Sequence, residues 1–450
     1  MTVAKTPMSA IRFGYGFHPL QKHASGPEEL LDQLSDASTD PPTLAPTTID
    51  ERRRSVGQLA KLRRSNASQQ AIRDGRRELR RRAMQDGAVQ LLNKALSPHG
   101  FFERLSSFWT DHFTVGAKNA AQAVFVPDYE QAAIRPYVTG RFADLLVSAI
   151  QHPAMLTYLD QVASVGPNSV LGKRTGKGLN ENLARELLEL HTLGAGANYS
   201  QTDVRNAAHL LTGFGVNRKT LSFKFFPQRA ARGQFRVLDR TYGGPPTPRH
   251  ATQMLNEIAN HPATAAHISR KLAVHFVSDN PSISLVKAIE RAWRQTDGDL
   301  KSVYRAMVEH PLAWTEFGLK AKKPQDLLIS TLRAMGLTAE HVEEMGTRGK
   351  IRILAALRDL NQPLYRPPGP NGWPEEAEAW ITPQGLTARL DFASAVGQVL
   401  AKRTQIDPRR FAESALRDAL APSTAFAVGA APERWEGLAY TIASPEFNRR

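Results

Sequence analysis

Cysteine is absent from this chain of 450 residues. Its absence excludes disulfide bonds, a thiol nucleophile and a metal site built from thiolates. No run of about eighteen apolar residues occurs either, so the sequence predicts no membrane span. The first residues lack the long apolar stretch of a secretory signal peptide, which favours a cytoplasmic location.

The chain has fewer acidic than basic residues, 43 against 58, and a net charge of +15. Much of the excess lies between Glu51 and Arg82, where twelve Lys or Arg residues stand beside three acids. Apolar residues recur there at helical spacing, so we expect a basic helical arm over residues 51–97. A solvated arm is the usual behaviour of such a charge run, and binding of an anionic surface through Arg52–Arg82 is the functional alternative.

Aromatic residues are also missing from this arm, since none occurs between Glu51 and Gly100. Without a stacking platform for bases, sequence-specific recognition of nucleic acid is not expected.

Helical periodicity dominates the rest of the chain, and the 41% share of hydrophobic residues is sufficient for a core. We therefore predict a mainly α, single large multi-helical domain with a small irregular or β-hairpin insert. Its parts are an N-terminal segment with a Pro/Thr-rich linker (1–50), the arm (51–97) and a helical core (98–450) with the insert at 215–248. Three His-Pro pairs, at His152, His261 and His310, read as junctions that open a new helix.

The densest polar pattern falls between Gly178 and Val204. Asn180 fits a helix N-cap, and Gly194 and Gly196 fit the C-terminal end. At about 100° per residue, one arc of about 140° collects five polar side chains: Glu181, Asn182, Arg185, Glu186 and Glu189. Arg185 lies four residues from both Glu181 and Glu189, so it can bridge them.

Two interpretations of this arc remain open. It is either a solvated face with ion pairs of little energetic consequence, or a polar cluster in a cleft whose excess negative charge suits acid/base chemistry or a cation. His191 projects onto the apolar side of the helix and so reads as a hydrogen-bonded core histidine. His112, on a helix rich in aromatics, is a further candidate. The sequence predicts no cofactor and leaves metal binding open.

A loop at Arg366–Trp373 combines prolines, glycines and a tryptophan, with Trp380 close behind. These tryptophans either form a ligand wall or anchor the loop to the core, and we favour anchoring.

Several separated motifs resemble the DUF1800 family, a bacterial domain-of-unknown-function family of mostly helical proteins. The strongest is NENLARELLELHTLG (180–194), and the others run in order along the chain: IRFGYG (11–16), FWTDHFTV (108–115), HPAMLTYLD (152–160), YSQTDVRNAAHLLTGF (199–214), HPATAAHISRKLAVHFVSDNPS (261–282), PPGPNGW (367–373) and SPEFNRR (444–450). The resemblance implies a helical fold and no established reaction. It also implies a partner from a co-encoded sulfatase-like family, and many relatives look exported.

Two departures from the family pattern stand out. Phe214 replaces the usual Trp, and Ala230 and Ala231 stand where relatives tend to carry a His-acid pair. If that pair performs chemistry in relatives, this chain has lost it.

Two functions follow from these observations, and whether the protein is an enzyme stays undecided. The favoured one is a non-catalytic accessory or scaffold protein that acts with a partner. The alternative is a hydrolase-type enzyme in which Glu186 and Glu189 serve as acid and base and Arg185 holds an anionic or carbohydrate substrate. Adsorption of the arginine arm to an anionic membrane surface is a third, weaker option.

Overall fold

The computed structural model describes residues 5–37, 40–117, 119–120, 122–403 and 405–450. Residues 38 and 39 of the expected linker lie outside these ranges. The described chain is mainly α-helical, with two small two-stranded antiparallel sheets, which confirms the predicted fold class. None of its helices is long and apolar enough to cross a membrane.

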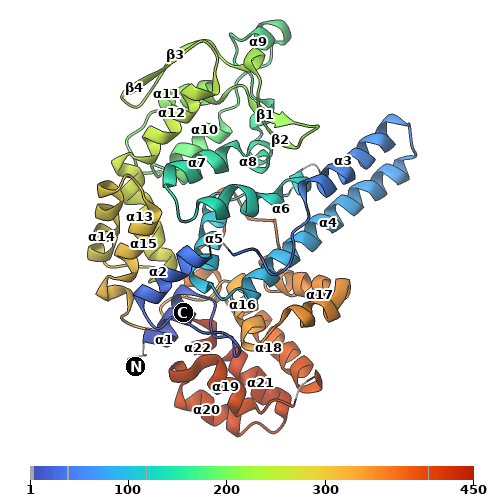
Figure 1. The fold of residues 1–450 in the computed structure, drawn as a ribbon, viewed down its shortest axis with the longest axis vertical. Helices are drawn as coiled ribbons and strands as arrows, with labels where there is room; N and C mark the ends of the chain where they lie inside the picture. Colours follow the sequence, from blue (N-terminus) through green and yellow to red (C-terminus); the bar gives the residue numbers. More distant parts are fainter. Residues whose placement is uncertain (1–4, 38–39, 118, 121, 404) are drawn as a thin grey trace.

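The first helices lead into a long antiparallel pair that projects from the body (Figure 1). After α1 (Lys5–Met8) and α2 (Pro27–Asp36), helices α3 (Ile49–Arg64) and α4 (Gln69–Leu96) span most of the predicted arm. Thr48 and Glu51 form a capping box that begins α3, and the Ser68 side chain caps α4. Leu59 and Leu79 are buried on the hairpin, while most of its arginines are exposed.

The expected linker is tied to the arm. Leu44 exchanges two hydrogen bonds with the Asn93 side chain on α4, at 2.8 and 2.9 Å.

Helix α5 (Gly100–His112) lies at the centre of the molecule. Its aromatic face packs into the larger core, where Trp109 is fully buried and donates to the Tyr304 hydroxyl at 2.6 Å. The helices that contribute to this core include the following: α7 (Phe142–Gln151), α8 (Pro153–Tyr158), α11 (Gln201–Leu211), α12 (Pro248–Ala259), α13 (Pro262–Phe276), α14 (Ile283–Gln295) and α15 (Leu300–Val308). The short helices α6 (Val126–Tyr129) and α9 (Val170–Thr175) connect them.

A second core joins the end of α4 to the C-terminal helices. They are α16 (Pro324–Ala334), α17 (Ala339–Asp359, kinked at Gly346), α18 (Pro383–Arg403), α19 (Pro408–Leu416), α20 (Pro422–Gly429), α21 (Arg434–Ala443) and α22 (Pro445–Asn448). Because α5 and α16 face each other between the two cores, polar groups on both helices meet there.

The three His-Pro pairs begin helical segments, as predicted. At His152, His261 and His310, the ring Nδ1 accepts a hydrogen bond from the backbone N–H two residues later, at 3.1 to 3.2 Å. Each histidine therefore acts as an N-cap, and the proline takes the first helical position, where no N–H is required.

The predicted insert consists of two β-hairpins. Strands β1 (Phe214–Asn217) and β2 (Ser222–Phe225) pair, as do β3 (Gly233–Val237) and β4 (Arg240–Gly244). Ala230 is buried between the hairpins, and a Cβ on Gly166 would lie 2.6 Å from the backbone of Ala231. Ala230 and Ala231, where the resemblance led us to expect a lost His-acid pair, are thus small residues in close packing.

The segment expected to be one regular helix from Asn180 changes character midway. Helix α10 (Asn182–Glu186) continues as a π-helical turn over Leu187–His191. Glu181, rather than Asn180, takes the N-cap position, while the Asn180 side chain accepts from the backbone N–H of Asn182 at 2.9 Å. Because a π turn is wider than an α turn, the spacing of 100° per residue does not hold beyond Glu186.

Candidate functional site

A network of buried charges lies where α5, α13, α16 and the loop at 366–380 converge. Lys323 Nζ lies 2.8 Å from both Asp111 Oδ2 and Glu375 Oε1. His275 Nδ1 lies 2.7 Å from the same Glu375 oxygen, and Lys320 is within 3.7 Å of the other. Each carboxylate therefore has at least one cation against it, as burial of charge requires.

A neighbouring part of the network holds Asp326 between two arginines. Its Oδ2 is 3.2 Å from Arg104 and 3.7 Å from Arg450, and these arginines are 1% and 0% exposed. Although burial alone would raise it, the two guanidinium groups lower the pKa of Asp326 to about 2. Burial lowers the pKa of Lys322, the next basic group along the chain, to about 7.

His275 is neutral in this network, because burial lowers its pKa to about 3 despite the neighbouring Glu375. A neutral imidazole has one N–H, and the 2.7 Å contact with a carboxylate requires it on Nδ1. Nε2 then accepts from Arg104 at 3.3 Å. His275 thus links the two halves of the network through one defined tautomer.

The loop at 366–380 closes over α5 through Asp111. Gly372 adopts φ +78°, and a Cβ there would lie 2.5 Å from the backbone oxygen of Asp111, so only glycine fits without strain. The Trp373 N–H donates to Asp111 Oδ1 at 3.0 Å, and the buried Trp380 indole donates to the Pro374 carbonyl at 2.9 Å. Trp380 anchors the loop, as expected of both tryptophans.

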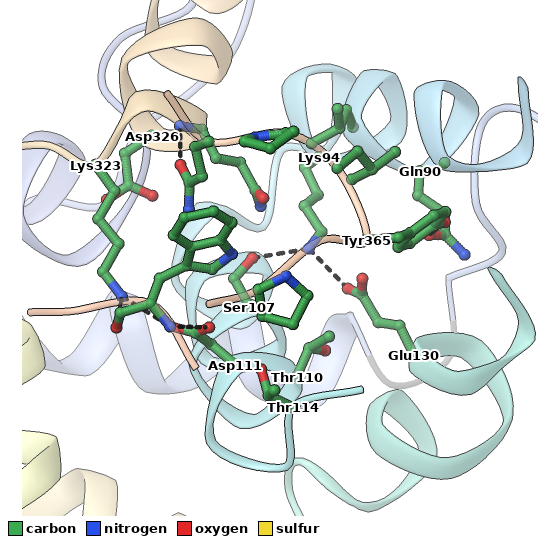
Figure 2. Close-up of a pocket in the computed structure, with 18 of the residues that line it drawn as sticks. Gln90, Lys94, Ser107, Thr110, Asp111, Thr114, Glu130, Lys323, Asp326 and Tyr365 are labelled. Carbon is green, nitrogen blue, oxygen red and sulfur yellow. Dashed lines mark hydrogen bonds and ion pairs between the residues drawn. The ribbon is translucent and has the colours of Figure 1, made fainter. Parts of the chain in front are cut away.

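Trp373 differs from that expectation, because it lines two pockets, and Asp111 lines both of them as well. One, the α4 pocket, has a volume of about 120 Å³. Figure 2 shows its polar floor, in which Lys94 Nζ lies 2.8 Å from both Ser107 Oγ and Glu130 Oε1. Lys94 and Glu130 therefore neutralise each other, and neither is left as an unpaired charge that could bind a ligand.

The other, the α13 pocket, has a volume of about 390 Å³. Its walls come from three segments: α5, α13 and the loop at 371–376. Phe108, Val274 and Trp373 supply the apolar surface, while Arg270 and Lys271 supply positive charge. Its two deeper carboxylates, Asp111 and Glu375, are already paired with Lys323.

Lys271 is the unusual group in this pocket. Among the described residues, no hydrogen bond or ion pair is made by its Nζ, and none by the exposed Arg270 guanidinium. Burial lowers the pKa of Lys271, while the charges of Asp111 and Glu375 act in the opposite direction. A partly buried cation without an anion is costly, which is the arrangement expected when a ligand supplies the anion.

Three histidines surround this lysine, and all are neutral near pH 7. Burial lowers the pKa of His191 to about 3 and that of His267 to about 4, and it holds the pKa of His112 well below its usual range. The positive charge of Lys271 is the second cause for all three histidines. His112 is 3% exposed and lines the pocket. Its Nε2 lies 3.1 Å from the His191 carbonyl, so Nε2 carries the proton. Nδ1 then has a free lone pair and no partner among the described residues.

The comparisons with known proteins concern the whole chain. A family model, described as a protein of unknown function (DUF1800), matches residues 9–449. The chain belongs to the DUF1800 family. No curated protein and no solved structure matches it. In the described part of this DUF1800 chain, no group of three or more His, Asp or Glu residues could hold a metal ion.

The candidate arc predicted from sequence lies apart from both pockets. Arg185 contacts Glu181 at 3.5 Å and Gln201 at 3.0 Å, and in the described structure it makes no ion pair with Glu189. Asn182 is exposed, and Glu181, Arg185, Glu186 and Glu189 are partly buried. Burial, followed by the charge of Glu189, raises the pKa of Glu186. A catalytic role for Glu186 and Glu189 stays a prediction.

The two histidines named from the sequence differ in their outcome. His112 belongs to the α13 pocket, not to the Glu181–Glu189 arc. His191 is fully buried, as predicted, but neither ring nitrogen has a hydrogen-bond partner among the described residues. The expectation of a hydrogen-bonded core histidine was therefore wrong, because the π turn places its ring against Phe113 and His112 instead of polar groups.

The α13 pocket was not predicted from the sequence, although the sequence contains a signal for it. His267, Lys271 and His275 are spaced by four residues along α13, so they lie along one face of the helix. Three basic side chains on one stripe of a largely apolar helix would have marked it as a candidate site.

Proposed function

We propose that this DUF1800 protein binds a small anionic ligand in the α13 pocket. The observation that carries this proposal is the partly buried Lys271, which has no anionic or hydrogen-bonding partner in the described chain. Arg270 adds a second free cation at the rim, and Phe108 and Trp373 provide apolar contact for the body of a ligand. A volume of about 390 Å³ is in the range of small-molecule sites.

Isothermal titration calorimetry with inorganic phosphate, sulfate and acetate tests the proposal. The wild type is expected to bind at least one of these anions. Lys271→Met should weaken that binding about tenfold or more, because a hydrogen bond to a charged group contributes about 1.5–3 kcal/mol. Lys173→Met is the matched control, since Lys173 is an exposed lysine on α9. Equal affinities in wild type and Lys271→Met would refute the proposal.

An accessory role with a protein partner is a second candidate, and the arm supports it. Arg54, Arg63, Arg64, Arg73, Arg76 and Arg80 are exposed and have no acidic partner in the described chain. Free arginines on a projecting hairpin suit an acidic partner surface. Co-purification from the native host, repeated with Arg73→Ala, Arg76→Ala and Arg80→Ala combined, tests this role. A wild type that retains no partner reproducibly would count against it.

A further inference from the structure

The two free cations of the α13 pocket differ in one chemical respect. Arg270 is permanently charged, whereas Lys271 can lose its proton and become a nucleophile. A ligand that carries only a carboxylate or phosphate would pair with the charges of Arg270 and Lys271, without using the nucleophilic property of Lys271. A ligand with a carbonyl next to its anionic group would use both residues.

We propose that Lys271 forms a Schiff base with the carbonyl carbon of a small 2-oxo acid whose carboxylate is held by Arg270. This inference rests on the proposed anion binding and names the ligand class. Three features of the pocket support it: the Lys271 amine has no partner in the described structure, the lining is partly apolar, and the neighbouring Arg270 guanidinium also has no partner among the described residues.

The covalent step balances without any further reactant. The neutral amine attacks the carbonyl carbon and forms a carbon–nitrogen bond, which gives a carbinolamine. The two protons that leave nitrogen are transferred to the former carbonyl oxygen, and that oxygen departs as water.

Burial favours the neutral amine that this step requires. Removal of the ammonium group from water lowers the pKa of Lys271, and the charge of Lys323 acts in the same direction. The opposing carboxylates, Asp111 and Glu375, are already engaged by Lys323, so neither is ion-paired with Lys271. Lys173, in contrast, is exposed.

Reductive trapping tests the proposal on the full-length wild type. The protein is incubated with glyoxylate or pyruvate and sodium cyanoborohydride, which reduces the imine to a stable secondary amine. Peptide mass spectrometry then measures the adduct at each lysine. We expect Lys271 to be labelled about tenfold or more above Lys173, with saturation as the 2-oxo acid concentration rises, because the reaction occurs within a bound complex. Inorganic phosphate should compete with labelling of Lys271 and leave Lys173 unaffected.

Lys271→Arg separates this inference from the proposed function. Arginine keeps the charge but forms no imine under these conditions, so anion binding should persist while the adduct disappears. If the wild type binds phosphate but labels Lys271 no more than Lys173, the Schiff base is refuted and anion binding stands. If neither phosphate, sulfate nor acetate binds and labelling does not saturate, both proposals fall. The wild-type labelling pattern decides the matter even if Lys271→Arg does not fold.

Discussion

Replacement of Asp326 by Asn removes one carboxylate from between two buried arginines. Arg104 and Arg450 are 1% and 0% exposed, so neither can turn to water for compensation. Loss of one partner of a buried ion pair costs about 3–5 kcal/mol, because the remaining charge stays buried and uncompensated. We therefore expect Asp326→Asn to lower the free energy of unfolding at pH 7 by that amount.

Part of this difference depends on pH, and its sign follows from the shift. The pKa of Asp326 is about 2 in the folded chain, against an ordinary value of 3.8 for an aspartate. A lowered carboxyl pKa contributes stability above the unfolded pKa, and the contribution is lost as the pH falls through the folded pKa. The difference between 3.8 and about 2 corresponds to about 2 kcal/mol. The gap between wild type and variant should therefore narrow by about 2 kcal/mol between pH 5 and pH 2.

Urea unfolding followed by circular dichroism at a series of pH values measures both effects, and urea adds no ions that would screen the pair. Asp239→Asn is the control, since Asp239 pairs with Arg236 at 3.2 Å on the surface, with side chains 99% and 67% exposed. Such an exposed pair contributes at most about 1 kcal/mol. A loss below about 1 kcal/mol for Asp326→Asn, or a gap independent of pH, would refute the reasoning.

Three further predictions concern the walls of the pockets and the predicted arc. Gly372→Ala should destabilise the protein by about 1–3 kcal/mol and weaken anion binding, because φ is +78° and the new Cβ would approach the Asp111 carbonyl. Thermal melts measure the loss of stability, and Gly178→Ala is the control because a Cβ there meets open space. Lys94→Met should cost about 3 kcal/mol in urea unfolding, because it removes the nearer of the two cations beside the buried Glu130 and leaves only Arg135, at 4.0 Å. The exposed Arg77→Ala should change stability by less than about 1 kcal/mol. Glu186→Gln should raise the melting temperature at pH 8 but not at pH 4. Because the pKa of Glu186 is raised in the folded protein, the wild type loses stability as the pH rises through that pKa, and the neutral glutamine avoids this loss. A lower melting temperature for the variant at pH 8 would contradict burial as the cause of the raised pKa.

Local features of the fold were accessible from sequence, because they depend on residues close together in the chain. Ser200, for example, forms a capping box with Asp203, three residues further along the chain. The His-Pro pairs and the position of the β-hairpin insert were predicted for the same reason. The wider turn after Glu186 was not, since no local signal distinguishes it from a regular helix, and the predicted bridge from Arg185 to Glu189 was lost with it.

The charge network and the α13 pocket depend instead on contacts between distant parts of the sequence. Arg104 meets His275 and Asp326, which lie 171 and 222 residues further along the chain. Hydrophobic periodicity identifies which face of a helix is buried but not which helix packs against it. The basic stripe on α13 could therefore be identified as unusual, whereas its meeting with His112 and Trp373 required the tertiary structure.

The same sequence separations bear on the order of folding. Closing loops of 171 and 222 residues before any contact is gained is entropically unfavourable, so structures with such distant contacts form slowly. The arm, by contrast, joins α3 to α4 through a turn of only a few residues and can form early. Recovery of anion binding during refolding should therefore lag behind recovery of helical circular dichroism. The α13 pocket therefore forms late in folding, and a ligand would bind only after the distant segments of the chain have packed together.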